Sequence, residues 1–358
     1  MKKPAALILA GLLAIALMTP ALCESWSQIN QTIQMKEGWQ RIVEHSAFSL
    51  GESNEITAEN GKTFIEKGFG SYPSIDGSTV MVPMAIEFAR QHLHLSEADL
   101  TGFVAFSTTH NAYLNLIHST PNGSAALVME EAVMDAKHPV DLMLGTEPSD
   151  EELTLAAAHG VTLIKKPLCY DAFVFITHAS NPVEDLSLEQ IRAIYRGEIT
   201  NWAEVGGNDA EIEAYQRNQN SGSQTAMENM VMRGEVIKSN KSVGIHYIQD
   251  MSSLARMIGG YQSTEHGIGY TYKYYLDELY HNESVKMLSI DGVYPSAENL
   301  RQGTYPLTAQ YFGVIRAGDE AKAGGLFLDW MLSEEGQRCI EQAGYIPFMQ
   351  LDIKKEGD

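Results

Sequence analysis

One arginine stands just ahead of three small residues in the stretch RNQNSGSQTAMENM. Arg217 precedes the triplet Ser221, Gly222 and Ser223, and the residues after the triplet favour a helix. The first turn of a helix exposes unpaired N–H groups at the positive end of the helix dipole, where anions bind. An arginine fork beside it adds charge-assisted hydrogen bonds. The stretch fits a site for a tetrahedral oxyanion; the simpler interpretation is that Ser221 only caps the helix and Arg217 lies on the surface.

Hydroxyl-bearing residues also follow three apolar stretches in the first half of the chain. These junctions contain Ser78 and Thr79, then Ser107, Thr108 and Thr109, and finally Thr146. In open α/β sheets, ligands bind outside the carboxyl ends of the strands. We therefore expect the three junctions to converge on one site with the Arg217 loop. Asp76, directly before the first junction, is a weaker candidate for orienting it.

The elements that position these residues alternate between strand-like and helix-like patterns. Strands are expected near residues 72–77, 102–107, 141–145, 170–178 and 267–272, and most are followed by amphipathic helices. Ser149 and Ser187 are expected to cap two of the helices. Such alternation predicts an α/β protein with mostly parallel sheets flanked by helices. The chain has 358 residues, more than a single core usually organises, so we expect two lobes.

The N-terminus has the layout of a secretory signal peptide over residues 1–23. Two lysines precede an apolar run of about 14 residues, which is shorter than the roughly 20 needed to span a membrane. We expect an exported protein, periplasmic or extracellular. Cys23 is either the last residue removed or the site of a lipid anchor, although Leu22 departs from the lipoprotein pattern. Whether Cys169 and Cys339 pair is left open by their spacing.

Charge and motif content exclude several functions. The formal net charge of −21 repels nucleic acid and anionic membranes, so an anionic ligand must be held by local donors. His92 and His94 are two residues apart and would face different sides of a helix, which makes a poor metal pair. The sequence has no nucleophile elbow, P-loop or zinc-ligand spacing. We therefore expect no cofactor, no metal and no enzymatic activity; a phosphoester hydrolase using a serine of NSGSQ would need a base that the nearby sequence does not offer.

Several blocks, in order from about residue 72 to residue 348, resemble the PstS-like phosphate-binding proteins of bacterial phosphate ABC importers, a group of periplasmic binding proteins. The blocks include IDGSTVMVPMAIEFA, VDLMLGTEPSDEE, RNQNSGSQTAMENM, GIGY and FLDWMLSEEGQRCIEQAGYIPF. The most specific block is YDAFVFITHASNPVEDLSLEQIRAIYRGEITNWAEVGG, residues 170–207.

The resemblance implies a two-lobed α/β fold whose lobes are joined by hinge strands and close on the ligand. One lobe would comprise residues 24–168 plus 290–358, and the other residues 169–289. The family's anion-binding positions fall on three sets of residues in this chain: Ser78 and Thr79 in the first loop; Thr108, with Thr109 as an alternative, in the second; and Arg217, Ser221, Gly222 and Ser223 in the second lobe.

Two loops depart from the family pattern. The second loop is usually glycine-rich but reads FSTTHNAY here, and the third often carries an aspartate or serine where this chain has Thr146. An aspartate there accepts a hydrogen bond from protonated phosphate and so selects it over sulfate, and Glu147 is a candidate substitute. Thr146 therefore leaves the identity of the anion open.

The resemblance implies a monomeric solute-binding protein that captures inorganic phosphate, or a related oxyanion, and delivers it to an ABC-transporter permease. Two alternatives remain: a binding protein of the same fold for another small anionic solute, and a sensory or adhesion module without transport.

Overall fold

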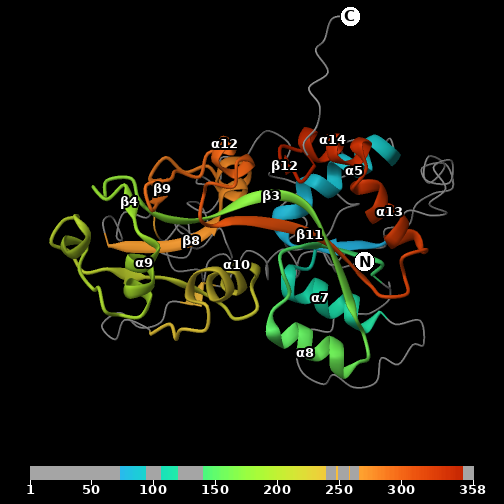
Figure 1. Cartoon of the computed structure of the whole chain (residues 1–358), viewed down its shortest axis with the longest axis horizontal. Coiled ribbons are helices and arrows are strands. Elements are labelled where there is room, and N and C mark those ends of the chain that lie inside the picture. The colour runs from blue at the N-terminus through green and yellow to red at the C-terminus, as the bar shows by residue number, and fades with distance from the viewer. Residues whose placement is uncertain are drawn as a thin grey trace, which may run out of the picture.

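The computed structural model describes residues 73–93, 106–119, 140–238, 247–248, 258 and 266–349. The signal peptide with Cys23, and also His94, lie outside these residues, as does the side chain of His92. The described part forms an elongated α/β molecule with two halves joined by long strands (Figure 1). The predicted two-lobed α/β fold class is thus confirmed.

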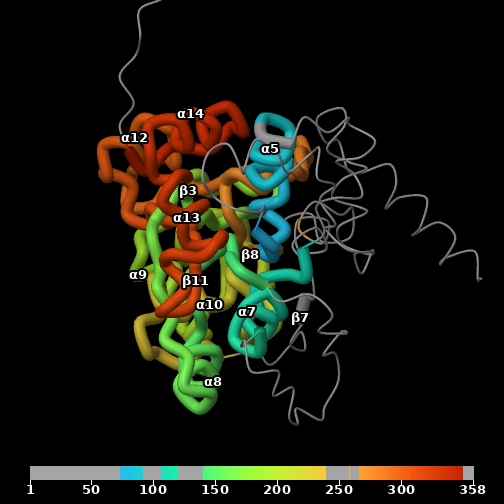
Figure 2. The backbone as a smooth tube through the Cα atoms, turned by 90° about the vertical axis from the view of Figure 1, so that its right-hand side faces the viewer, coloured from blue at the N-terminus to red at the C-terminus, as the bar shows by residue number. Residues whose placement is uncertain are grey.

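One half packs helices on two faces of a small sheet. Its strands are β1 (Ile75–Gly77) and β2 (Leu142–Gly145), which pair in parallel. Figures 1 and 2 both place α7 (Thr109–His118) and α8 (Asp150–Ala158) on the opposite side of the sheet from α5 (Val82–Leu93) and α14 (Glu334–Gln342). α13 (Ala323–Met331) packs on β2 and on β11 (Thr308–Arg316). A 3-10 turn, Thr79–Met81, leads into α5, and the short strand β12 (Ile346–Pro347) is the last strand of the described residues.

The other half is built from shorter elements. Its strands are β4 (Asp185–Leu186), β5 (Glu213–Ala214), β6 (Gln216–Arg217), β7 (Tyr247–Ile248), β8 (Gly267–Tyr272), β9 (Val285–Met287) and β10 (Ser289–Ile290). Its helices are α9 (Leu188–Tyr195), the 3-10 helix Trp202–Val205, α10 (Gly222–Ala226) and the π-helices Met227–Met232 and Tyr275–Leu279. α12 (Ala297–Arg301) packs on the connecting strand β3 (Leu163–His178).

Two long strands connect the halves. β3 (Leu163–His178) pairs with β11 (Thr308–Arg316) along its first part and with β8 and β9 along its second part. The strand order β1-β2-β11-β3-β8-β5 therefore runs through both halves (Figure 1). β3 therefore belongs to both parts of the sheet.

The expected parallel pairing holds at the edges and not in the middle. The pairs β1–β2, β5–β8, β6–β7 and β4–β10 are parallel. By contrast, β3 is antiparallel to β11 and β8, and β11 is antiparallel to β2. The difference arises because β3 and β11 carry the chain from one half to the other in opposite directions.

Local signals explain how the main helices start. Ser149 and Ser187 each accept a hydrogen bond from the backbone N–H three residues later and form full capping boxes, as predicted.

Cys169 and Cys339 are both buried as free thiols. Within the described ranges, no helix is long and apolar enough to cross a membrane.

Candidate functional site

Arg217 lies inside the molecule, at the end of β6. It is only 6% exposed, so the interpretation of Arg217 as a surface residue is wrong. Its Nη1 donates to Ser223 Oγ at 3.5 Å, and its backbone N–H donates to the Tyr270 hydroxyl oxygen at 3.1 Å. Ser221 caps α10 by accepting from Gln224 N, as predicted. β6 and α10 together therefore hold a guanidinium beside the start of a helical segment. We call this set, Arg217 and residues 221–223, the α10 side.

The hydroxyl-bearing junctions of the half that contains β1 and β2 lie together. The backbone N–H of Ser78 donates to Leu144 O at 2.8 Å, which fixes the first junction beside the end of β2. A Cβ placed on Gly145 would lie 3.5 Å from Ser78 Cβ, so Ser78 and Thr146 flank the same point. Thr109 is buried at the start of α7. We call this set, Ser78, Thr79, Thr108, Thr109 and Thr146, the α7 side.

The two sides meet at Gly222. A Cβ built on Gly222 would lie 2.4 Å from Thr146 Oγ1 and 3.1 Å from Thr109 Oγ1. These approaches need the bare glycine backbone, because a contact below 3.0 Å forces neighbouring atoms to move. The structure thus brings Gly222, Thr146 and Thr109 together, as the convergence of the junctions predicted.

A second contact between the halves lies nearby. Asn220 Nδ2 donates to Glu151 Oε2 on α8 at 2.6 Å. Next to it, His110 Nδ1 lies 2.8 Å from the buried Glu152 carboxylate. The hydrogen bond to Glu152 raises the pKa of His110 above its ordinary value, against the opposing effect of burial.

Asp76 organises the first two loops. One carboxylate oxygen accepts from the backbone N–H groups of Gly77 and Ser107 at 2.7 and 2.8 Å, and the other accepts from Ser107 Oγ and Asn115 Nδ2. Four donors thus hold a buried carboxylate that in turn fixes the strand end against the start of α7. The prediction that Asp76 orients the first loop is consistent with this geometry.

Thr146 has a buried hydroxyl with no well-formed hydrogen bond, although the Tyr272 hydroxyl lies near enough to interact with it. The residue is 3% exposed, and its Oγ1 forms no hydrogen bond of good geometry with the described residues. Its carbonyl oxygen, in contrast, accepts from Tyr113 Oη at 2.7 Å. A buried hydroxyl without a hydrogen bond costs roughly 1–3 kcal/mol, so its position requires an explanation.

Thr108 and Thr79 occupy the rims of their loops. Thr108 is exposed and has φ 79°, a left-handed conformation that normally requires glycine. Backbone strain of this kind is typical of binding loops. Thr79 is half-buried at the start of its 3-10 turn. Thr109, rather than Thr108, is the second-loop residue that the structure brings to Gly222.

Glu147 follows Thr146 in the sequence, but its side chain is exposed to solvent. Its side chain is 52% exposed and forms an ion pair with Lys165 Nζ at 2.8 Å. A carboxylate in this setting is half-solvated and already paired, which differs from the buried acceptor that the family pattern places at this loop.

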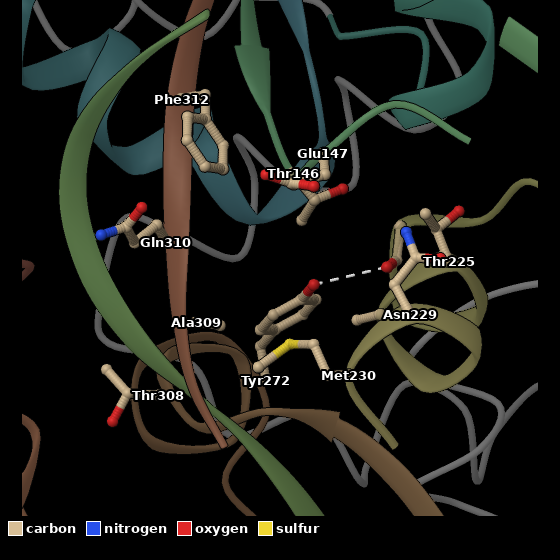
Figure 3. A pocket seen from close by; sticks show the side chains of 12 residues that line it. Thr146, Glu147, Thr225, Asn229, Met230, Tyr272, Thr308, Ala309, Gln310 and Phe312 are labelled. Atoms are coloured by element: carbon tan, nitrogen blue, oxygen red, sulfur yellow. Dashed lines mark hydrogen bonds between the residues drawn. The ribbon is translucent and has the colours of Figure 1, made fainter. Parts of the chain in front are cut away.

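A cavity of about 330 Å³ opens next to the junction of the two sides. Figure 3 shows Tyr272 in the middle of the cavity, with Thr146 and Glu147 on one side and Asn229 and Met230 on the other. Its remaining lining residues are Gly222, Thr225, Ala226, Thr308, Ala309, Gln310 and Phe312. Thr146 and Gly222 therefore belong both to the meeting point and to the cavity.

Two tyrosines that hold the site give no signal in the sequence. Tyr272 Oη donates to Gly222 O at 3.3 Å, and Tyr113 Oη donates to Thr146 O, so each positions one backbone segment of the meeting point. Both lie in ordinary apolar stretches, and their partners are 50 and 33 residues away. Only the fold reveals these pairs.

Among the residues described, no cluster of three or more His, Cys, Asp or Glu side chains is arranged to hold a metal ion.

Comparisons with known proteins place this geometry in a family. Residues 101–335 match the model of the PBP superfamily domain. The phosphate-binding protein PstS of Bacillus subtilis is 28% identical over 315 residues, which cover 87% of this chain and 91% of that protein. PstS of Borreliella burgdorferi is 25% identical over 278 residues, covering 76% and 88%.

Solved structures agree with the relatives. A protein from Clostridium perfringens, described as a phosphate ABC transporter substrate-binding protein with bound phosphate, superimposes with a TM-score of 0.55 at 26% identity. The match covers 78% of this chain and 100% of that one. An ABC-type phosphate transport receptor from Vibrio cholerae shares the fold, with a TM-score of 0.53 at 20% identity over 76% of this chain and 99% of that one.

Proposed function

Because the chain belongs to the PBP superfamily and resembles its PstS members, we propose that it is an extracytoplasmic solute-binding protein that captures inorganic phosphate for an ABC importer. The relatives and the phosphate-bound neighbour carry names of that function. These relatives are binding proteins, and we propose binding without bond chemistry for this chain as well.

The observation that carries the proposal is the buried Arg217, which contacts Ser223, next to Gly222 at the meeting point with Thr146. Arg217 itself lines a second cavity, of about 310 Å³, together with Gln224 and Glu228. A phosphate bound at the meeting point would receive charge compensation from Arg217 and hydrogen bonds from Ser221, Ser223 and the N–H groups of residues 222 and 223. Local donors of this kind can hold an anion in spite of the net charge of −21.

The α7 side would complete the cage with hydroxyls. Thr146 and Thr109 lie closest to Gly222, and Ser78, Thr79 and Thr108 would line the same pocket. Both sides can touch one ligand only when the halves are closed, so binding would shift a hinge equilibrium toward the closed form. The lobes proposed for this movement are residues 24–168 plus 290–358 and residues 169–289, with β3 and β11 as the connection.

We also propose export through the leader of residues 1–23, action as a monomer and delivery to a permease. Support comes from the leader pattern and from the relatives' names. Attachment through Cys23 is a separate question, which mass spectrometry of the membrane fraction would answer by showing or excluding a lipid on that cysteine.

The function is tested by a thermal-shift panel followed by titration calorimetry. A ligand that binds only the folded protein raises the melting temperature by mass action. We expect phosphate to raise it most among phosphate, sulfate, molybdate and simple organic acids. A larger shift with sulfate or molybdate would contradict phosphate and favour the alternative of another oxyanion; no shift with any anion would contradict the proposed class.

A further inference from the structure

The cavity beside the meeting point is much larger than an inorganic anion needs. Its volume of about 330 Å³ lies within the range of about 300–1,000 Å³ that is common for small-molecule sites. A tetrahedral oxyanion has five non-hydrogen atoms and fills roughly the space of two or three water molecules, on the order of 80 Å³. Most of the cavity would remain beside a bound phosphate.

The cavity and the anion site share two residues. Thr146 and Gly222 line the cavity and also form the contact between the α7 and α10 sides. The buried Thr146 Oγ1, which has no well-formed hydrogen bond, lies at this boundary. A phosphoryl group held at Thr146 and Gly222 would therefore have this cavity beside it for a substituent.

The lining of the cavity specifies the chemistry of that substituent. Polar groups come from Thr225, Asn229, Thr308 and Gln310, and apolar surface from Ala309, Met230, Phe312 and the ring of Tyr272. Glu147 is the only charged residue among the described residues that line it, and Lys165 balances it from outside the lining. A substituent with a second negative charge would meet this carboxylate, whereas hydroxyl groups would find donors and acceptors and a short carbon chain would find apolar contacts.

We propose that the cleft also binds phosphomonoesters with a small, uncharged, hydroxylated substituent, of about the size of glycerol phosphate. The phosphoryl group occupies the proposed phosphate site, and the substituent occupies the cavity between Thr146 and Asn229. This inference rests on the proposed function, since it needs an anion site at the meeting point, and it widens the ligand class from inorganic phosphate to phosphate carrying an organic group.

Asn229 offers a way to close the cavity without touching the anion site. It lines the cavity yet is exposed, so a larger side chain there need not disturb the core. Asn229→Trp would fill space that the substituent needs. The matched control is Glu341→Trp, which adds the same ring at an exposed position of α14, outside the cavity.

The experiment compares the affinities of the purified protein and both variants for phosphate, sn-glycerol 3-phosphate and 3-phosphoglycerate by titration calorimetry. We expect the unmodified protein to bind glycerol 3-phosphate within roughly tenfold of phosphate. 3-Phosphoglycerate should bind at least tenfold more weakly than glycerol 3-phosphate, because its carboxylate would meet the carboxylate of Glu147. A tenfold change in affinity corresponds to about 1.4 kcal/mol. Asn229→Trp should weaken glycerol 3-phosphate by roughly tenfold or more and leave phosphate within about threefold. Glu341→Trp should change neither affinity.

Each other outcome has a distinct meaning. Binding of phosphate with no binding of glycerol 3-phosphate overturns this inference and leaves the proposed function intact. Equal loss of both ligands in Asn229→Trp, or no loss of either, shows that the substituent does not occupy this cavity and overturns the placement. Binding of neither ligand overturns the proposed function and this inference together.

Discussion

The two sides of the cleft differ in what they offer an anion. The α10 side supplies a buried guanidinium and the start of a helical segment, with Arg217, Ser221 and Ser223 within seven residues of sequence. The α7 side supplies hydroxyls from three separate junctions, the first two of which are held by the Asp76 carboxylate. Positive charge gives binding energy to any oxyanion, whereas placed hydroxyls distinguish one anion from another. We infer that the α10 side provides affinity and the α7 side provides selectivity.

The largest expected effect lies on β3, the strand that connects the two halves. Asp171, on β3, accepts hydrogen bonds from Tyr311 Oη at 2.6 Å and from the backbone N–H groups of Ala172 and Tyr274. Burial raises the pKa of Asp171 from 3.8 to about 7, although these hydrogen bonds oppose the rise. Because the folded state holds the proton more tightly than the unfolded state, the stabilising contribution is present at low pH and is lost as pH rises from about 4 to about 7.

We expect the free energy of unfolding to fall over this interval by on the order of 4 kcal/mol from this residue alone. Urea denaturation at a series of pH values measures the slope. Asp171→Asn, which keeps the shape and removes the titration, should flatten it, while Asp329→Asn, at an exposed position of α13, should not. An unchanged slope in Asp171→Asn would show that folding does not raise the pKa of the Asp171 carboxyl. Phosphate affinities of variants on the two sides could then be compared without a correction for the protonation of Asp171.

On the α10 side, Arg217→Ala should weaken phosphate binding by about 2–4 kcal/mol, because a buried anion would lose its main charge compensation. Titration calorimetry gives the change directly. Arg196→Ala is the matched control, since Arg196 pairs with Glu189 and Glu198 on the surface. Unchanged affinity in Arg217→Ala would contradict the assignment of affinity to the α10 side.

At the meeting point, Gly222→Ala should weaken phosphate binding by about 2 kcal/mol. The added Cβ would lie 2.4 Å from Thr146 Oγ1, and Thr146 is buried and short, so the two sides would be held apart. The double variant Gly222→Ala/Thr146→Ala removes the clashing hydroxyl, so its loss of affinity should be smaller than the sum of the losses in the two single variants, which gives a coupling energy between the sides. Additive effects of the two substitutions would indicate that the sides do not meet in the bound state.

The α10 side and the α7 side also differ in how far sequence could predict them. Ser221 as a cap and Arg217 at a strand end follow from local patterns, since caps and strand ends are set by neighbouring residues. The sequence predicted that Thr146 would converge with the Arg217 loop, but it gave no sign of Tyr272, because the partner of Tyr272 is distant in sequence and the contact exists only after the halves pack. The start of β3 could not be predicted either, because its pairing partner β11 is distant in sequence. Lys165, Lys166 and Pro167 are not typical of a strand, yet β3 begins at Leu163.

The α7 side is tested most directly by the buried hydroxyl of Thr146. Thr146→Val removes Oγ1 and keeps the shape, so phosphate binding should weaken by about 1.5 kcal/mol, the scale of a hydrogen bond to a charged group. The stability of the ligand-free protein should hold or rise, because a buried hydroxyl without a well-formed hydrogen bond is removed. Denaturation without phosphate and calorimetry with it separate the two effects.

Thr271 provides the matched control for Thr146. Its Oγ1 is also buried without a well-formed hydrogen bond, but it follows Tyr270 and precedes Tyr272 on β8, so strand alternation turns it to the face opposite Tyr272 and the cavity. Thr271→Val should therefore raise or preserve stability and leave the affinity for phosphate unchanged. If both variants lost affinity equally, the loss would reflect general repacking; if only Thr146→Val lost affinity, and lost more for phosphate than for sulfate, the α7 side would be the side that selects the anion.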